Sequence, residues 1–188
     1  MANEIEIKFR IAELRALTRA LKGAGFKQLT PPTHEMNALY DLPGQKLRRQ
    51  GQLLRLRKYG EEWVLTHKSK GKPGRHKIRV ELETRVKDGE QMDAILRALG
   101  YAPTFRYEKY RAEWSDGTGH VVLDQTPIGV FGEIEGTARW IDRTARALRI
   151  PAANYITQTY ADLFFHWKRR TRSKAFEMTF QAVGARKP

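Results

Sequence analysis

The sequence contains no cysteine among its 188 residues. Disulfides and thiolate metal sites are therefore excluded, and a reducing cytoplasm is the expected location. No apolar run is long enough to cross a bilayer, and the charged opening leads us to expect no signal peptide and no membrane partner. Negative charge is scarce, because 21 Asp and Glu oppose 35 Lys and Arg, which gives a formal net charge of +14. This excess implies an anionic partner, such as nucleic acid, a phosphorylated small molecule or an acidic surface.

Charged and apolar residues alternate without a break from residue 4 to residue 11, which is the period of a strand. A pair of carboxylates two residues apart, with an aliphatic residue between them, occurs three times, and each copy precedes a helical stretch: Glu4 and Glu6, Glu81 and Glu83, and Glu133 and Glu135. Side chains at this spacing point to one face of a strand. The pairs therefore indicate concentrated oxygen ligands for hard cations.

The remaining patterns predict an α+β order of strands and helices in one domain. Strands are expected at 36–41, 53–58, 63–68, 77–86, 105–114 and 120–124, and helices at 13–24, 91–99 and 138–148, with a last helix that carries Tyr160, Phe164 and Trp167. Those three aromatic residues are interpreted as helix core. Asp88 is expected to cap the second helix, with Gln91 at the answering position.

Residues 4–26 and 81–101 share one pattern, which is an acidic strand, an amphipathic helix, a glycine and an aromatic residue. Two related halves could close their strands into a barrel. Helices packed outside would then cover the apolar faces, and the charged faces would line an interior with water, metals and an anion. An open sheet with one solvated face explains the alternation equally well.

Basic residues on the same strand faces favour the barrel. Arg55 and Arg57 share one face across Leu56, Lys68 ends the next strand, and Lys109 and Arg111 share a face further on. Arginine offers planar forks to phosphate oxygens and lysine offers point charges. Carboxylates and cations together form the residue set for a metal-bound polyphosphate. The candidate metal ligands are Glu4, Glu6, Asp124, Glu133 and Glu135, and the candidate phosphate ligands are Arg55, Arg57, Lys68, Arg79, Lys109 and Arg111.

At these residues the chain resembles the CYTH superfamily of triphosphate tunnel metalloenzymes, which includes class IV adenylyl cyclases and thiamine triphosphatases. The matching motifs occur in family order: residues 4–8, 40–41, 54–57, 65–68, 80–83, 108–111, 123–124 and 131–135. The resemblance implies a closed antiparallel eight-stranded barrel with helices packed outside. It implies a tunnel domain over residues 1–168 and a basic tail over 169–188. The residue pattern itself predicts one more short strand at 176–181. Leu42 departs from the Thr of many members, which we expect to affect loop shape.

The resemblance also assigns roles to the residues. Lys8 and Glu6 would be catalytic. Metal ligands, for about two Mg²⁺ or Mn²⁺ ions, would be Glu4, Glu6, Asp124, Glu133 and Glu135, with Glu81 and Glu83 as further acidic wall. Phosphate ligands would be Lys8, Arg55, Arg57, Lys68, Arg79, Lys109 and Arg111.

Three functions remain open from the sequence. The favoured one is a metal-dependent phosphohydrolase acting on tripolyphosphate, a nucleoside triphosphate or thiamine triphosphate, because water is always available as the nucleophile. The second is an adenylyl cyclase, which also needs a nucleobase pocket. The third is a binding module for RNA or polyphosphate through the basic tail, although residues 168–174 are interpreted first as a solvated helix end. The oligomeric state is left open.

Overall fold

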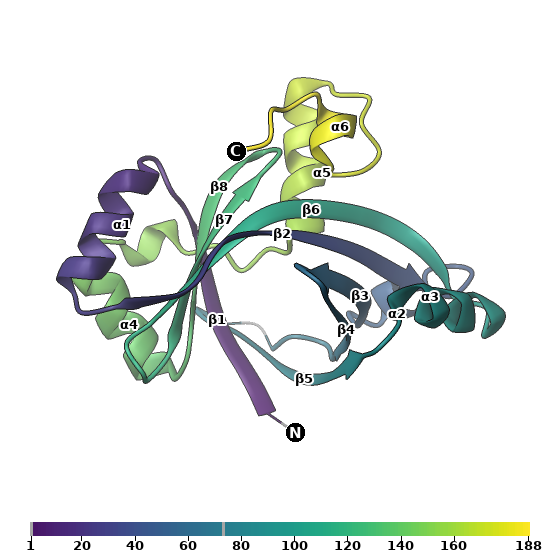
Figure 1. Cartoon of the computed structure of the whole chain (residues 1–188), viewed down its shortest axis with the longest axis horizontal. Helices are drawn as coiled ribbons and strands as arrows, with labels where there is room; N and C mark the ends of the chain where they lie inside the picture. Colours follow the sequence, from purple (N-terminus) through teal and green to yellow (C-terminus); the bar gives the residue numbers. More distant parts are fainter. Residues whose placement is uncertain (1, 73) are drawn as a thin grey trace.

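The computed structural model describes residues 2–72 and 74–188. Within them, antiparallel strands form a closed barrel in the order β1-β5-β4-β3-β2-β6-β7-β8 (Figure 1). The strands are β1 (Ala2–Arg10), β2 (Lys27–Asp41), β3 (Leu53–Tyr59), β4 (Glu62–Lys68), β5 (Lys77–Val86), β6 (Ala102–Ser115), β7 (His120–Thr126) and β8 (Gly129–Glu135). The predicted eight-stranded barrel is confirmed, and the open sheet is excluded.

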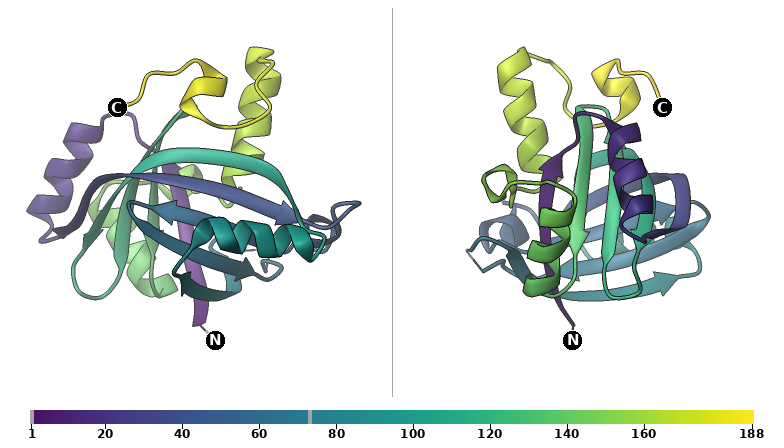
Figure 2. Two further views of the ribbon diagram at one scale, coloured as in Figure 1. Left: turned by 45° about the vertical axis from the view of Figure 1, so that its right-hand side comes forward. Right: turned by 90° about the vertical axis from the view of Figure 1, so that its left-hand side faces the viewer.

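Helices lie outside the barrel, as predicted (Figure 2). They are α1 (Leu14–Gly23), α2 (Lys46–Arg49), α3 (Gly89–Ala98), α4 (Ala138–Ala147), the 3₁₀ turn η1 (Ala152–Asn154), α5 (Tyr160–Thr171) and α6 (Phe180–Val183). The Asp88 side chain accepts a hydrogen bond from the Gln91 backbone N–H at the start of α3, which confirms the predicted cap. No helix in the described part of the chain is both long and apolar enough to span a membrane.

Apolar side chains of the strands point outward and form the core with these helices. Ile7 of β1 lies opposite Ile134 of β8, and both are completely buried against residues of α1 and α4, such as Leu21 and Ile141. Burying such a side chain is worth about 1.5–3 kcal/mol. Because alternate residues of a strand face opposite ways, this packing turns Glu4, Glu6 and Lys8 into the barrel.

A glycine in β8 lets two strands approach closely. A Cβ at Gly132 would lie 2.2 Å from the ring of Phe9 on β1, so only glycine fits at this position. Phe9 is thereby buried beside the strand that carries Glu133 and Glu135.

The predicted extra strand at 176–181 is wrong. Met178 makes a single parallel bridge to Tyr107 at an edge of β6, and the chain then turns into the short helix α6. The Thr179 side chain caps this helix by accepting the Ala182 N–H, and Gly184 ends it with a φ of +71°. Phe180 is buried, so part of the expected tail packs against the barrel.

Candidate functional site

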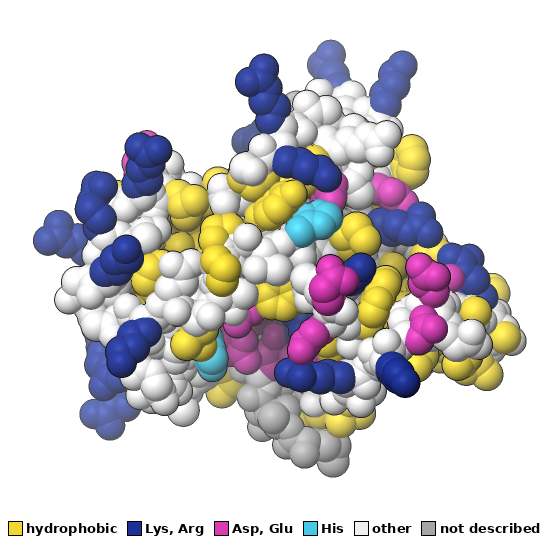
Figure 3. All heavy atoms as spheres, viewed as in Figure 1, with side chains coloured by type: hydrophobic (Ala, Val, Ile, Leu, Met, Phe, Trp, Pro, Cys, Tyr) yellow, Lys and Arg dark blue, Asp and Glu magenta, His cyan; other side chains and the backbone are white. Residues whose placement is uncertain are grey.

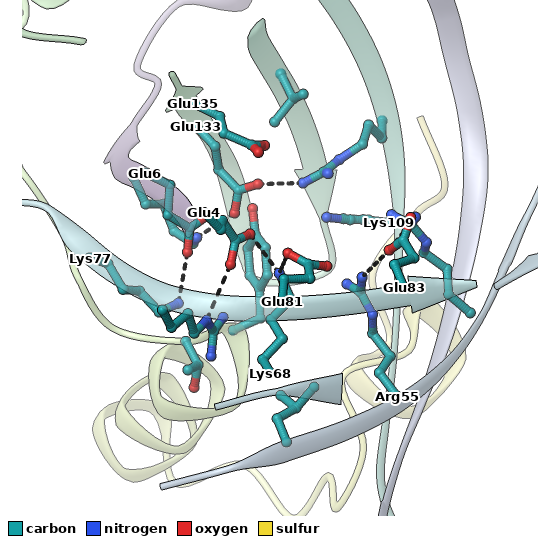
Figure 4. A pocket seen from close by; sticks show the side chains of 18 of the residues that line it. Glu4, Glu6, Arg55, Lys68, Lys77, Glu81, Glu83, Lys109, Glu133 and Glu135 are labelled. Atoms are coloured by element: carbon teal, nitrogen blue, oxygen red, sulfur yellow. Dashed lines mark hydrogen bonds and ion pairs between the residues drawn. The ribbon is translucent and has the colours of Figure 1, made fainter. Parts of the chain in front are cut away.

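Charged side chains of both signs line a cavity of about 560 Å³ inside the barrel (Figure 4). Eight lysines and arginines and seven glutamates contribute to its wall. The sequence-predicted residues that line it are Glu4, Glu6, Lys8, Arg55, Arg57, Lys68, Arg79, Glu81, Glu83, Lys109, Arg111, Glu133 and Glu135. The volume lies within the range of small-molecule sites. The barrel therefore brings together side chains that are up to 131 residues apart in the sequence.

The carboxylates of β1 pair with cations from β4 and β5. The Lys68 Nζ lies 2.6 Å from Glu4 and 2.9 Å from Glu81. The Lys77 Nζ lies 2.7 Å from Glu6, and the Arg79 Nε donates to Glu4 at 3.2 Å. Figure 4 shows Glu4, Glu6, Lys68, Lys77 and Glu81 together on one side of the cavity. Each predicted phosphate ligand here is thus neutralised by a predicted metal ligand.

The two arginines of β3 face the cavity as predicted. The Arg55 Nη2 donates to the Thr66 hydroxyl at 3.3 Å, and the Arg57 Nη2 lies 3.4 Å from Glu83. Leu56 between them is 3% exposed and packs outside the barrel with Leu96 of α3. The predicted assignment of the two strand faces is confirmed.

Asp124 of β7 lies behind the cations. Its carboxylate accepts two hydrogen bonds from Arg111, at 2.7 and 2.6 Å, one from Lys109 at 2.9 Å and one from the Tyr160 hydroxyl at 2.6 Å. It is completely buried. The predicted role of Asp124 as a metal ligand would require these donors to move, and in this arrangement it anchors two phosphate-binding candidates.

Sequence reasoning missed several residues at the site, among them Glu113, which lines the cavity. Glu35 of β2 contacts Lys109, Arg57 and Arg111. Lys77 pairs with Glu6, and Tyr160 was interpreted only as helix core, although it also lines the cavity. The predicted strand began one residue after Glu35, so extending the alternation upstream to Glu35 would have found it. Lys77 carried a similar signal, because it lies two residues before Arg79 on the same face.

The charge pattern shifts the ionisation of the acidic side chains. Burial opposes ionisation of Glu6, but Lys8 and Lys77 lower its pKa to about 2. Burial likewise opposes ionisation of Glu133, and Lys8 and Arg111 still hold its pKa well below the ordinary value. Glu135 behaves in the opposite way: although the residue is exposed at the end of β8, desolvation by the surrounding protein and the nearby charges of Glu4 and Glu6 raise its pKa to about 7. Negative charge is therefore least compensated near Glu135.

This carboxylate group fits hard cations, although it is not preassembled around one. Among the described residues, no three His, Asp or Glu side chains already converge as a metal site. Glu4 and Glu6 instead face lysines, and beside desolvation the negative charges of Glu4 and Glu6 contribute to the raised pKa of Glu135. A divalent ion would relieve the repulsion between these charges, and carboxylate oxygens are the donors that Mg²⁺ and Mn²⁺ prefer. Glu4, Glu6 and Glu135 are the residues that would hold it.

A closed barrel with a lumen of paired carboxylates and cations defines the class of triphosphate tunnel proteins. The chain matches the CYTH domain over residues 2–160 and belongs to the CYTH family. Its members are adenylyl cyclases or triphosphatases that generally depend on divalent metals. The match ends at the first residue of α5, so most of α5 and the tail lie beyond it.

Two similar sequences and one similar structure accompany this match. A Methanocaldococcus jannaschii protein, provisionally named adenylate cyclase, is 25% identical over 85% of this chain and 97% of its own length. Adenylate cyclase CyaB of Aeromonas hydrophila is 26% identical over 70% of this chain and 67% of its own. A Hippeastrum protein, described with a dominant triphosphatase activity, shares the fold with a TM-score of 0.63 and 20% identity, over 87% of this chain and 95% of its own.

Proposed function

We propose that this protein is a divalent-metal-dependent phosphohydrolase that cleaves a triphosphate bound in the barrel, with inorganic tripolyphosphate as the simplest substrate. One observation carries the proposal. Every predicted phosphate ligand lies in one cavity and is held there by a carboxylate, as Lys8 is by Glu133 and Lys68 is by Glu4. A linear polyanion can replace these carboxylates at the cations, while a metal ion takes the carboxylates that are released.

The aromatic rings of the cavity favour a substrate without a nucleobase. The Tyr160 ring already carries two ammonium groups, with the Lys8 Nζ at 4.5 Å and the Lys109 Nζ at 4.8 Å from its centroid. The Tyr107 ring packs between Tyr160 and Phe105, with centroids 6.0 Å from each. These two tyrosines therefore serve the cations and the core, which leaves them poorly placed to stack on a base.

The chain's own residues suit attack by water on a terminal phosphorus. A new P–O bond forms to the water oxygen, the bond to the bridging oxygen breaks, and orthophosphate and pyrophosphate leave. Lys8 stays protonated, because Glu133 and Glu6 raise its pKa against the effect of burial, and it can donate to an oxygen that gains charge. Glu6 stays ionised and can orient the water or accept its proton. A bound divalent ion would supply further neutralisation of the phosphate charge.

The direct test is a product assay with tripolyphosphate, ATP and thiamine triphosphate in parallel, in Mg²⁺, in Mn²⁺ and in EDTA. We expect orthophosphate from tripolyphosphate in either metal and no turnover in EDTA. Glu6→Gln should abolish turnover and keep the fold, whereas Glu61→Gln on the surface, whose side chain is 96% exposed, should behave like the wild type. Full turnover in EDTA, or an active Glu6→Gln variant, would refute the proposal.

Adenylyl cyclase activity is the second candidate, and the names of the two similar sequences favour it. In that reaction the ribose 3′-hydroxyl attacks the α-phosphorus and pyrophosphate leaves. The same assay separates the two reactions, because cyclic AMP forms from ATP only in the cyclase.

The outer surface gives some support to the third candidate, a polyanion-binding role. Exposed cations repeat at i, i+4 and i+7 on two neighbouring helices: Arg15, Arg19 and Lys22 on α1, and Arg139, Arg143 and Arg146 on α4. Figure 3 shows basic side chains along the side of the molecule where these helices lie. Reversing these six charges should weaken the binding of duplex RNA and make that binding less dependent on salt concentration. If reversing Lys168, Arg169 and Arg170 weakens RNA binding equally, the effect comes from the net charge of the protein and not from the surface of α1 and α4.

A further inference from the structure

Glu35 is a buried carboxylate that the proposed chemistry does not use. It lies on β2 opposite Lys109 of β6 and Tyr59 of β3, with no exposed surface. It is absent from the cavity wall that Glu4, Glu6 and Glu83 help to form. An ion or substrate in the cavity would therefore meet the surrounding cations before it met Glu35.

Three cations surround this carboxylate from behind. The Lys109 Nζ lies 3.4 Å from Oε1, while Arg57 Nη1 and Arg111 Nε each lie 3.8 Å from Oε2. The Asn37 amide donates to Oε1 at 2.9 Å, but Oε2 has no hydrogen-bond donor among the described residues. Charge therefore dominates the interaction of Glu35 with these cations. The same three cations also line the cavity, so they lie between Glu35 and any molecule bound there.

The carboxylate stays ionised. Burial alone would raise the pKa of Glu35, yet Lys109, Arg111 and Arg57 hold it far below its ordinary value. Glu35 thus differs from Glu135, whose pKa lies near neutrality. Three cations packed together without substrate would repel one another, and a fixed anion behind them offsets that repulsion.

We propose that Glu35 is a positioning residue that acts as a resident counter-anion. It holds Arg57, Lys109 and Arg111 in place when no substrate is bound, and it lowers the affinity of these cations for phosphate. The inference rests on the proposed binding of triphosphate. The inference adds that Glu35 limits the affinity of the tunnel for triphosphate and for the pyrophosphate product. Phosphate shares these cations with Glu35, so pyrophosphate leaves faster than it would from an uncompensated cluster.

The test compares Glu35→Gln with the wild type by calorimetric titration of tripolyphosphate and pyrophosphate in EDTA, followed by kinetics in Mg²⁺. Removing one unit charge at roughly 6–8 Å should tighten tripolyphosphate binding roughly tenfold. KM should fall, and kcat should fall with it as pyrophosphate release slows. Glu35→Asp keeps the charge and should bind within roughly threefold of the wild type.

The matched control is Glu108→Gln. Glu108 is a buried carboxylate on β6 that accepts the Phe180 N–H at 2.6 Å outside the barrel, so its loss should leave tripolyphosphate affinity unchanged. A Glu35→Gln protein that binds tripolyphosphate equally or more weakly, while the wild type binds it, overturns the inference and leaves the proposed function standing. If the wild type binds no tripolyphosphate in EDTA and none in Mg²⁺, the proposed function fails and takes the inference with it.

Folding gives a further check, because Glu35→Gln removes one of the carboxylates that neutralise the three cations, while Asp124, Glu133 and Glu83 remain. Should the variant be unfolded alone, tripolyphosphate is expected to restore a cooperative melting transition, since the ligand replaces the lost negative charge. A chain that stays unfolded in tripolyphosphate would overturn the inference, because the carboxylate would then be needed for the fold itself.

Discussion

Replacing Glu135 by Gln should remove a proton that metal binding otherwise releases. The pKa of Glu135 is raised to about 7, because desolvation by the surrounding protein and the charges of Glu4 and Glu6 disfavour its ionised form, although the residue is exposed at the end of β8. This carboxyl group is therefore more protonated at pH 6 than at pH 8. A divalent ion binds the ionised form and displaces the proton.

We therefore expect Mg²⁺ or Mn²⁺ to release more protons per site at pH 6 than at pH 8. The measurement is calorimetric titration of the ion in two buffers of different ionisation enthalpy at each pH. The Glu135→Gln variant should release almost no protons when the metal ion binds, and Glu61→Gln should release as many as the wild type. Release that does not vary with pH, or that persists in Glu135→Gln, would refute the assignment of Glu135 as the protonated ligand.

The same group makes a signed prediction for stability in EDTA. Its folded-state pKa lies above the ordinary value of 4.5, so between pH 4.5 and pH 7 the native state keeps a proton that the unfolded chain has released. The contribution of Glu135 to the free energy of unfolding therefore declines as pH rises through this window. Glu135→Gln should lack that decline, and a saturating metal ion should cancel it in the wild type.

Two further variants test the strand faces and the tail. Leu56→Ala should cost roughly 2–5 kcal/mol and lower Tm by roughly 4–20 °C, because a 3%-exposed side chain leaves a cavity, while the folded fraction keeps its turnover. A catalytic loss without a change in Tm would show that the faces are reversed. Truncation after Arg170 should lower Tm as well, because it removes buried Met178 and Phe180, and an unchanged Tm would contradict their packing.

Much of the site followed from local alternation. Glu4, Glu6 and Lys8 had to share one strand face whatever the rest of the chain did, and so did Arg55 and Arg57 across Leu56. Alternation is a property of the extended backbone itself, so it can be read without knowing the fold. The capping of α3 by Asp88 was equally local.

The tail shows where local pattern fails. Met178 and Phe180 alternate like strand residues, yet an available strand edge decides whether such residues form a ladder. At β6 the tail makes one bridge, and the Thr179 cap then turns the chain into helix. The competition between these outcomes depends on partners more than 70 residues away.

By itself, the sequence determined which residues share a face and that both signs of charge occur on it. Only the tertiary structure decided which opposite charges meet. Lys77 pairs with Glu6, Asp124 anchors Arg111 and Lys109, and Glu35 lies behind cations from two other strands. These pairings depend on the order and register in which the strands close into a barrel. Coulomb energy depends on distance and burial, and both are set by that closure.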